Sequence, residues 1–325
     1  MYKNFYNLKR NPFEITPDPS FLFPTRKHNE ALAALYYGVR RHKGFVVLTG
    51  EVGTGKTLLV RCLLQLLNRK DVAYAYVFNS RLNPVEFLQY SAGDFGLNVA
   101  GKNKSELLLE LSGFLISRHR QKQTTVLVVD EAHHLEVEVL EEIRLLTNLE
   151  TAEEKLLQIL LVGQPELDEK LDSTELRQLK QRIALRSRLE PLTLEETEGY
   201  IQRRLQLAGS DAQAAGLFPP ETMARVFRHS SGIPRLINTV CENALITAFA
   251  RQSQSVAADI IDEVATDFRL SVTHAPKPGA AEPEGSGNEV WQAVKTLLQL
   301  HDHLQSIRID EDDGSIPISP RTQRI

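Results

Sequence analysis

The sequence has few cysteines and no long apolar run, and each shortage argues against a class of protein. Only two of the 325 residues are cysteine, Cys62 and Cys241. Both lie in apolar runs with helical spacing, which favours buried, reduced thiols over a disulfide framework. No apolar stretch reaches the roughly 18 residues that indicate a membrane-spanning helix, and residues 1–5 lack the apolar region of a signal peptide. We therefore expect a soluble cytoplasmic protein without membrane insertion.

An excess of positive charge is also missing. The 38 lysines and arginines are outnumbered by 42 aspartates and glutamates, which gives a net charge of −4. The chain as a whole therefore lacks the basic signature of a nucleic-acid-binding protein. A local basic surface stays open, because basic residues gather in three runs, at 40–43, 102–104 and 118–122.

The segment 50–57 fits G-x-x-x-x-G-K-[ST], the pattern of a P-loop. A β-branched apolar run (44–49) precedes it and a helical pattern (58–67) follows, which is the context the motif requires. Glycines let the backbone curl around phosphates and point its N–H groups inward. We expect Lys56 to reach the β- and γ-phosphates and the Thr57 hydroxyl to hold Mg²⁺. The predicted nucleotide contacts are Gly50, Glu51, Val52, Gly53, Thr54, Gly55, Lys56, Thr57 and Leu58.

A second motif follows about seventy residues later, where the buried run 124–129 ends in Asp130 and Glu131. Carboxylates at the carboxyl end of a parallel strand lie at the edge where such sheets bind ligands. We expect Asp130 to hold Mg²⁺ through its water shell, and Glu131 to orient and deprotonate the attacking water. The pair favours a hydrolase over a passive nucleotide binder. His133 and His134 follow, but without further ligands at metal spacing they do not predict a metal site.

Two polar residues end other predicted strands. Gln164 follows the run 156–162, which places it near the γ-phosphate. Asn79 follows the run 72–78 and could hold Glu131 by a hydrogen bond, although a simple cap of the strand end explains Asn79 equally well.

Three arginines lead into the last predicted strand: Arg182, Arg186 and Arg188. An arginine here can stabilise transition-state charge on the nucleotide of a neighbouring subunit. The alternative for some of them is a solvated basic face.

Alternating strand and helix patterns predict an α/β fold with a parallel sheet covered by helices on both faces. The predicted strands are 44–49, 72–78, 124–130, 156–162 and 188–192. The predicted helices around them are 26–41, 55–69, 83–95, 104–120, 136–149 and 165–182. A small all-helical domain is then expected, with helices at 194–208, 219–230, 233–250 and 257–269.

These patterns divide the chain into five segments. Residues 1–25 are rich in proline and aromatics and predict an ordered loop whose phenylalanines pack on the domain that follows. Residues 26–193 form the nucleotide-binding domain and 194–270 the helical lid. Residues 271–289 have linker composition, and 290–325 combine a short amphipathic helix with a polar, disordered tail.

In this order, the P-loop, Asp130-Glu131, Gln164, Arg182 and a helical lid bearing Gly232-Ile-Pro-Arg235 resemble the AAA+ ATPases. More narrowly, the chain resembles the ExeA, or general secretion pathway protein A, type over roughly residues 1–270. The runs that carry this likeness are 5–13 with 17–23, 50–57, 161–167, and 181–183 before 189–192. Members of this type often continue into a membrane span and a periplasmic peptidoglycan-binding domain. This sequence continues only with the linker and tail, so the likeness does not by itself predict a cell-wall role.

The resemblance implies roles for single residues. Lys56 and Thr57 match Walker A, Asp130 and Glu131 match Walker B, and Gln164 matches sensor 1. Arg182 is the best match to the arginine finger, and Arg235 matches sensor 2, which reaches the nucleotide from the lid. The family further implies ATP and Mg²⁺ as cofactors, and homo-oligomeric rings or filaments whose active sites are shared between subunits.

Three functions follow as hypotheses. The first is an ATP-hydrolysing motor or switch that serves a protein partner in secretion or cell-envelope export, including exopolysaccharide export. The second is a DNA-binding ATPase that regulates transposition, similar to the TniB/MuB type, and it requires one of the basic runs to face duplex DNA. The third is an interaction scaffold with a degenerate site, which the intact Lys56, Asp130 and Glu131 disfavour.

Overall fold

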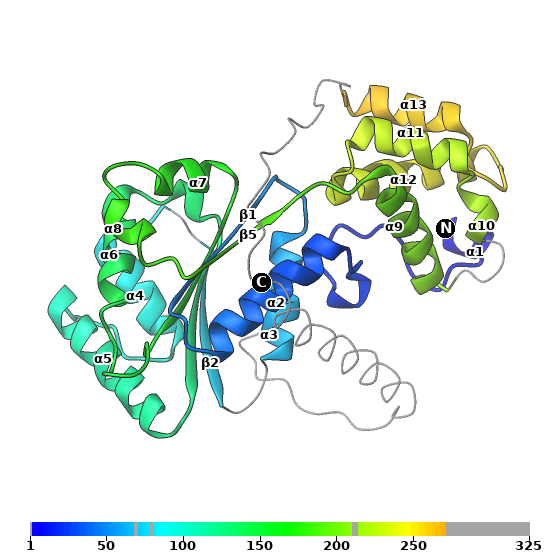
Figure 1. The fold of residues 1–325 in the computed structure, drawn as a ribbon. Coiled ribbons are helices and arrows are strands. Elements are labelled where there is room, and N and C mark those ends of the chain that lie inside the picture. The colour runs from blue at the N-terminus through cyan, green and yellow to red at the C-terminus, as the bar shows by residue number, and fades with distance from the viewer. Residues whose placement is uncertain (1, 68–70, 79–80, 210–213, 271–325) are drawn as a thin grey trace, which may run out of the picture. The chain divides into compact units, whose positions relative to one another are not determined.

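The computed structural model of the protein describes residues 2–67, 71–78, 81–209 and 214–270. All of these lie in one unit of the chain, residues 1–279. Within it, a parallel sheet with its helices precedes a region made of helices alone (Figure 1). The segments predicted as linker and tail, 271–289 and 290–325, lie outside the described residues, so those predictions stay predictions.

Five parallel strands form the sheet, in the order β2-β3-β4-β1-β5. Their bounds are β1 (Phe45–Gly50), β2 (Val72–Val77), β3 (Thr124–Val129), β4 (Gln158–Gly163) and β5 (Leu185–Leu189). All residues of β1, β3 and β4 are buried, as expected for strands covered on both faces. The predicted fold class is therefore confirmed.

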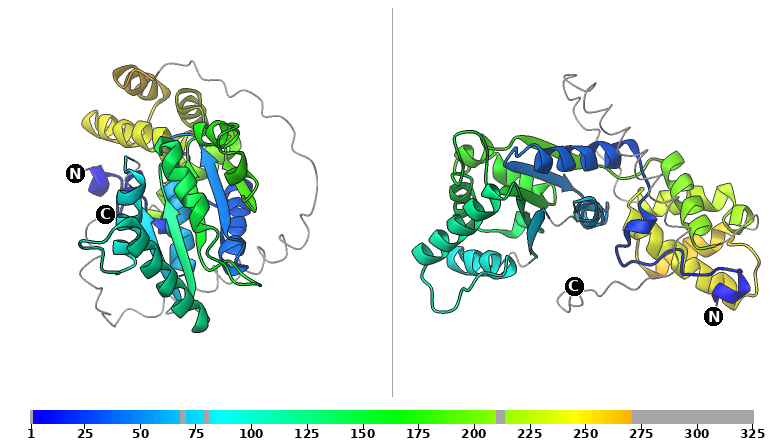
Figure 2. Two further views of the ribbon diagram at one scale, coloured as in Figure 1. Left: turned by 90° about the vertical axis from the view of Figure 1, so that its left-hand side faces the viewer. Right: turned by 90° about the horizontal axis from the view of Figure 1, so that it is seen from below.

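Helices cover both faces because side chains alternate along each strand. Val47, Leu127 and Leu161 pack on one face, and Val46, Val128 and Leu160 on the other. Figures 1 and 2 show α2 and α3 on one side of the sheet and α4, α5 and α6 on the other. The bounds of these helices are α2 (Arg26–Arg40), α3 (Lys56–Leu66), α4 (Pro84–Asp94), α5 (Lys104–Arg120) and α6 (Val137–Leu146).

The register brings three strand ends to one edge of the sheet. Thr49 of β1 is level with Gly163 of β4, and Val129 of β3 is level with Leu161 of β4. Residues that follow these strands, Gly50, Asp130 and Gln164, consequently gather at that edge.

The helical region follows β5. It consists of α9 (Leu194–Leu207), α10 (Ala214–Leu217), α11 (Pro220–Ser230), α12 (Pro234–Ala250) and α13 (Ala258–Asp267). Four of these match the predicted helices to within two residues, and only the short α10 is an addition. None of the helices in the described ranges is both long enough and apolar enough to cross a membrane.

Two predicted elements between β4 and the helical region differ from the structure. The single helix expected over 165–182 is two short ones, α7 (Glu166–Leu171) and α8 (Arg177–Lys180). The break contains Ser173 and Thr174, whose hydroxyls compete for backbone hydrogen bonds.

The last strand begins three residues before the predicted 188–192 and ends at Leu189. It lies at the sheet edge and pairs only with β1, so its charged, exposed Arg186 and Arg188 are tolerated there. Because arginines alternate with other residues in β5, the sequence showed no apolar run that would mark the start of the strand. Pro191 lies beyond its end and lacks the backbone N–H that strand pairing needs.

The N-terminal segment contains α1 (Tyr2–Phe5) and a 3-10 helix (Pro19–Phe21) within the predicted loop. Its aromatics Tyr2, Tyr6 and Phe13 are buried in the core of the helical region. The later part of the segment packs on the α/β domain, as expected, since Leu22 joins the core beside α3 and Arg61 of α3 donates to the carbonyl of Pro17 (2.9 Å). Arg204 of α9 fixes the segment by donating hydrogen bonds to the carbonyls of Pro12 (2.7 Å) and Glu14 (3.2 Å). The expected packing on the next domain thus holds for the end of the segment and not for its start.

Candidate nucleotide site

The P-loop has the backbone that its glycines allow. Gly53 and Gly55 adopt positive φ angles of 82° and 99°, a region that side chains disfavour. A Cβ at Gly50 would lie 2.9 Å from the carbonyl oxygen of Leu189, and one at Gly53 would lie 2.7 Å from Cβ of Arg235. The loop is therefore closely packed between β5 and the start of α12.

Lys56 starts α3 and is 7 % exposed. Its ammonium donates to the carbonyls of Gly50 (2.7 Å) and Glu51 (2.9 Å) within the loop. Burial lowers the pKa of Lys56, and the negative charges of Glu131 and Asp130 oppose that shift. The Lys56 ammonium therefore lies close enough to the carboxylates of Glu131 and Asp130 to feel their charge.

Asp130 directly follows β3 and is held by three donors. Its Oδ2 accepts from the Thr57 hydroxyl (3.2 Å) and from the Tyr76 hydroxyl (2.6 Å), and its Oδ1 accepts from the backbone N–H of Glu131 (2.9 Å). Burial, followed by the Asp130 charge, raises the pKa of Tyr76 well above its usual range. Tyr76 was missed in the sequence, where it reads as one more apolar-strand residue of 72–78.

Glu131 occupies the left-handed region, with φ 53° and ψ 34°. Such a backbone is uncommon for a residue with a side chain, and outliers of this kind cluster at functional sites. The Glu131 side chain is 46 % exposed, so it can reach a water molecule above the sheet edge. Asn79, expected to hold Glu131, lies outside the described residues.

Gln164 follows β4 and contacts His133. His133 is 9 % exposed and lies in the 3-10 helix Ala132–His134, with its Nε2 2.8 Å from the amide nitrogen of Gln164 and 3.5 Å from a carboxylate oxygen of Glu131. Ligand atoms of Glu131, His133 and His134 lie within 4.8 Å of one another. Because both ring nitrogens of His133 contact Gln164, this cluster is a hydrogen-bonded group and does not present three free metal ligands.

The helical region contributes the start of α12. The backbone N–H of Arg235 donates to the carbonyl of Gly53 (3.2 Å), so the predicted sensor 2 residue adjoins the P-loop. Gly232 makes this approach possible, because its φ is 74° and a Cβ there would lie 1.9 Å from the carbonyl oxygen of Leu192.

The three arginines of the predicted finger have different surroundings. Arg182 is half-buried and donates to the hydroxyl of Thr147. Arg186 pairs with Asp168 (3.2 Å) and Asp172 (3.7 Å). Arg188 is exposed and has no ion pair within the described part of the chain. Among the described residues, no side-chain contact joins any of the three to the P-loop of its own chain, so the finger assignment stays a prediction.

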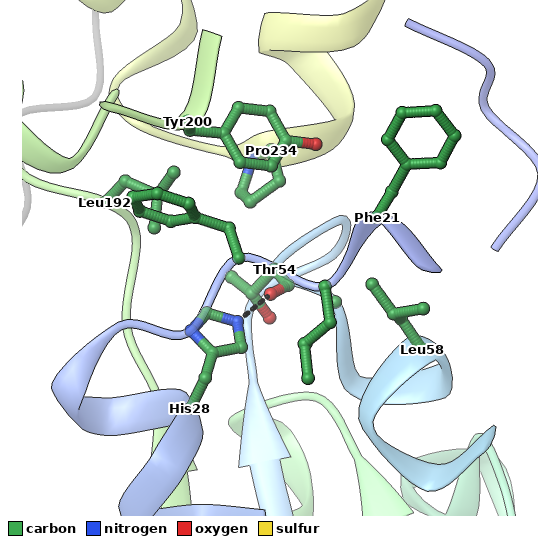
Figure 3. Close-up of a pocket in the computed structure, with 10 residues that line it drawn as sticks. Phe21, His28, Thr54, Leu58, Leu192, Tyr200 and Pro234 are labelled. Carbon is green, nitrogen blue, oxygen red and sulfur yellow. Dashed lines mark hydrogen bonds between the residues drawn. The ribbon is translucent and has the colours of Figure 1, made fainter. Parts of the chain in front are cut away.

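An apolar pocket adjoins the P-loop (Figure 3). His28 spans one side of it: its Nδ1 contacts the Thr25 hydroxyl (2.7 Å) and its Nε2 contacts the carbonyl oxygen of Thr54 (3.1 Å). Burial lowers the pKa of His28, so the ring is a neutral one. The pocket is lined by Phe21, Leu22, Phe23, His28, Thr54, Gly55, Leu58, Leu192, Tyr200 and Pro234.

Most of these lining residues were not predicted from the sequence. Thr54, Gly55 and Leu58 were, because they belong to the P-loop motif. The N-terminal aromatics and Tyr200 lie far from the motif along the chain, and only their apolar character was visible.

The basic runs have acidic neighbours. Arg40 pairs with Asp71 (3.0 Å), and His42 lies 3.4 Å from Glu154. In the run 102–104, both lysines form ion pairs with glutamates of α5 and α6. The runs 40–43 and 118–122 precede the start of β1 and β3, so they lie at the sheet edge opposite to the P-loop.

The chain is similar in sequence to an AAA domain and to a secretion-pathway protein. A family model described as an AAA domain matches residues 39–171. General secretion pathway protein A of Aeromonas hydrophila is 45% identical over 257 residues, which is 79% of this chain and 46% of that protein. The chain thus spans less than half the length of this relative.

Solved structures share the fold at low identity. The Aeropyrum pernix ORC2 protein superposes with a TM-score of 0.61 and 18% identity, over 80% of this chain and 72% of that one. Cdc6p from Pyrobaculum aerophilum superposes with a TM-score of 0.58 and 16% identity, over 82% and 70%. These likenesses show the fold alone.

Proposed function

Because the chain belongs to the AAA+ family of P-loop NTPases, in its general secretion pathway protein A type, we propose that it hydrolyses ATP. The observation that carries the proposal is the meeting of Lys56, Asp130, Glu131 and Gln164 at one sheet edge beside the P-loop. No other edge of the described sheet combines a phosphate-binding loop with a metal-binding carboxylate and a base.

The nucleotide would lie across the two regions. We place its phosphates at the P-loop and its base beside the apolar pocket lined by Phe21, Leu58 and Tyr200. Lys56 would exchange the carbonyls of Gly50 and Glu51 for the β- and γ-phosphates. Arg235 would approach the same phosphates from the start of α12, which already contacts Gly53.

The residues present fit Mg²⁺. The Thr57 hydroxyl and the Asp130 carboxylate lie within 3.2 Å of each other, and hydroxyl and carboxylate oxygens with water are the donors that Mg²⁺ takes beside phosphates. Thr57 and Asp130 would hold the ion, which would supply neutralisation of phosphate charge.

Each step of hydrolysis would be assisted by a different residue of the chain. Glu131 orients a water molecule and accepts its proton, and the strained backbone aims its carboxylate. Gln164 contributes a polar contact at the γ-phosphate. An arginine of the next subunit, Arg182 first among the three, would stabilise developing charge.

Release of the γ-phosphate would change the contact between the start of α12 and the P-loop. The angle of the helical lid (194–270) to the P-loop would change with it. We propose that the chain uses this change to drive or switch a protein partner in secretion or cell-envelope export, as a homo-oligomeric ring or filament with shared sites. Dependence on ATP suits a cytoplasmic location. The pathway rests on the relative named general secretion pathway protein A.

Phosphate release, measured with and without duplex DNA, tests the proposal. We expect Mg-dependent turnover that Lys56→Ala abolishes and that DNA leaves unchanged. Absence of turnover under all conditions, with the protein folded, would contradict an ATPase. Stimulation by DNA that is lost in Arg41→Glu, at an exposed residue of the run 40–43, would favour the transposition-type alternative over the export role.

A further inference from the structure

His133 is buried beside the site, and the mechanism above does not use it. It lies two residues after Glu131, and its ring faces Gln164 with both nitrogens. Nδ1 lies 3.3 Å from the backbone nitrogen of Gln164, and Nε2 lies 2.8 Å from the side-chain amide of Gln164. One side chain thus contacts the sensor residue twice and lies within 3.5 Å of the general base.

The positions of the hydrogens follow from these contacts. The backbone N–H of Gln164 is a donor, so Nδ1 has to accept, and a neutral ring then carries its hydrogen on Nε2. An Nε2–H needs an acceptor at 2.8 Å. The oxygen and nitrogen of an amide have nearly the same shape, and the hydrogen-bond network decides between them. The amide oxygen of Gln164 must therefore face His133.

From this we infer that His133 is a positioning residue for ATP hydrolysis: it fixes the side-chain amide of Gln164 with its oxygen toward the ring and its NH₂ toward the γ-phosphate. The inference rests on the proposed function. An NH₂ group is the useful end of the amide here, since phosphate oxygens accept hydrogen bonds and repel a carbonyl oxygen.

The surroundings keep the ring in place. Lys170 of α7 donates to the carbonyls of His133 (2.8 Å) and Leu135 (2.7 Å), which ties the 3-10 turn to the helix that follows Gln164. The ring also lies against that of His134 at an angle of 41°, with 3.9 Å between centroids. Burial, followed by the charge of His134, lowers the pKa of His133, which favours the neutral form that the argument needs.

A double-mutant cycle separates positioning from a structural role. We expect His133→Ala to lower kcat about 10–100-fold, the range that misplacement of a catalytic group produces, with the Kd for ADP unchanged. In a Gln164→Ala background the same substitution should have little further effect, because His133 acts only through Gln164. A histidine at the opposite edge of the sheet gives the control: His119→Ala, at the end of α5, should stay within about twofold of the unaltered protein.

A second experiment uses the unaltered full chain, so its result does not depend on whether a variant folds. Nitrogen NMR of the chain labelled with ¹⁵N-histidine reports which ring nitrogen of His133 carries the hydrogen. We expect the His133 ring to be neutral with its hydrogen on Nε2. A hydrogen on Nδ1, or an equal loss of kcat from His133→Ala in both backgrounds, would overturn the inference. Loss of turnover in the unaltered chain would instead reject the ATPase proposal, and the tautomer would still be decided by NMR.

Discussion

At the scale of single residues, the side chains that support the site matter as much as those that would touch ATP. Tyr76 holds Asp130 from the neighbouring strand, His28 holds the Thr54 carbonyl, and His133 holds Gln164. None of these three belongs to the motifs that predicted the site. Each makes a hydrogen bond that is short enough to restrict its partner.

Removal of the Tyr76 hydroxyl should weaken the hold on Mg²⁺. Tyr76→Phe keeps the ring but leaves Oδ2 of Asp130 with Thr57 alone, and the loss of such an outer partner costs about 10–100-fold in metal affinity. Binding of a fluorescent ATP analogue, titrated with MgCl₂, measures the effect. Tyr74→Phe on the same strand is the control, because Tyr74 is 43% exposed; equal Mg²⁺ dependence of the two variants would reject the role of Tyr76.

The neutral His28 should make stability depend on pH. Burial lowers its pKa from the ordinary value of 6.5, so below pH 6.5 the unfolded chain binds a proton that the folded chain resists. The stabilisation is thus full above pH 6.5 and is lost as the pH falls toward the lowered pKa. His28→Gln retains a donor for Thr54 but cannot titrate.

We compare the free energy of unfolding of the unaltered protein with that of His28→Gln. This difference should decrease as the pH is lowered from 7.5 to 5.5. Urea unfolding at several pH values measures this difference. A difference that stays constant or grows toward acid pH would show that His28 is not buried as a neutral ring.

At the scale of elements, the buried strands were predictable and the marginal ones were not. The runs at β1, β3 and β4 are mostly apolar, so their type followed from the sequence and their ends were placed to within two residues, which was enough to position Asp130 and Gln164. Strand β5 alternates arginine with apolar residues and was placed three residues late. A local pattern also could not show which distant core the N-terminal aromatics join.

The N-terminal segment should therefore stabilise the helical region. Phe13 is fully buried against Phe218, and Phe13→Ala should lower the free energy of unfolding by about 3–5 kcal/mol. Ile15→Ala is the matched control, since Ile15 is 54% exposed, and it should cost less than about 0.5 kcal/mol. Similar values for the two variants in urea unfolding would contradict this packing.

At the scale of the whole molecule, the proposed oligomer assigns one group of the site to a second copy. The sequence could predict an arginine here but not its surroundings, because these depend on tertiary contacts such as Arg182 with Thr147 and Arg186 with Asp168. To act in a neighbour's site, Arg182 would have to leave Thr147, whereas Arg188 has no such ion pair or hydrogen bond among the described residues.

Mixing of inactive variants tests the shared site. Arg182→Ala should bind ATP normally and hydrolyse it slowly, and Lys56→Ala should fail to bind it. Mixed oligomers should regain part of the turnover, because each variant supplies the group that the other lacks. If co-assembled mixtures stay inactive with Arg182→Ala but recover with Arg188→Ala or Arg186→Ala, the finger is reassigned; recovery with none removes the shared site.

The central claim is that this sheet edge hydrolyses ATP with Glu131 as the base, and single-turnover hydrolysis by Glu131→Gln tests it most directly. Lys56, Thr57 and Asp130 are intact in this variant, so ATP affinity should be retained. The rate of γ-phosphate cleavage should fall by ~10²-fold or more, the scale of a lost general base. Cleavage at the unaltered rate, with ATP still bound, would contradict the account.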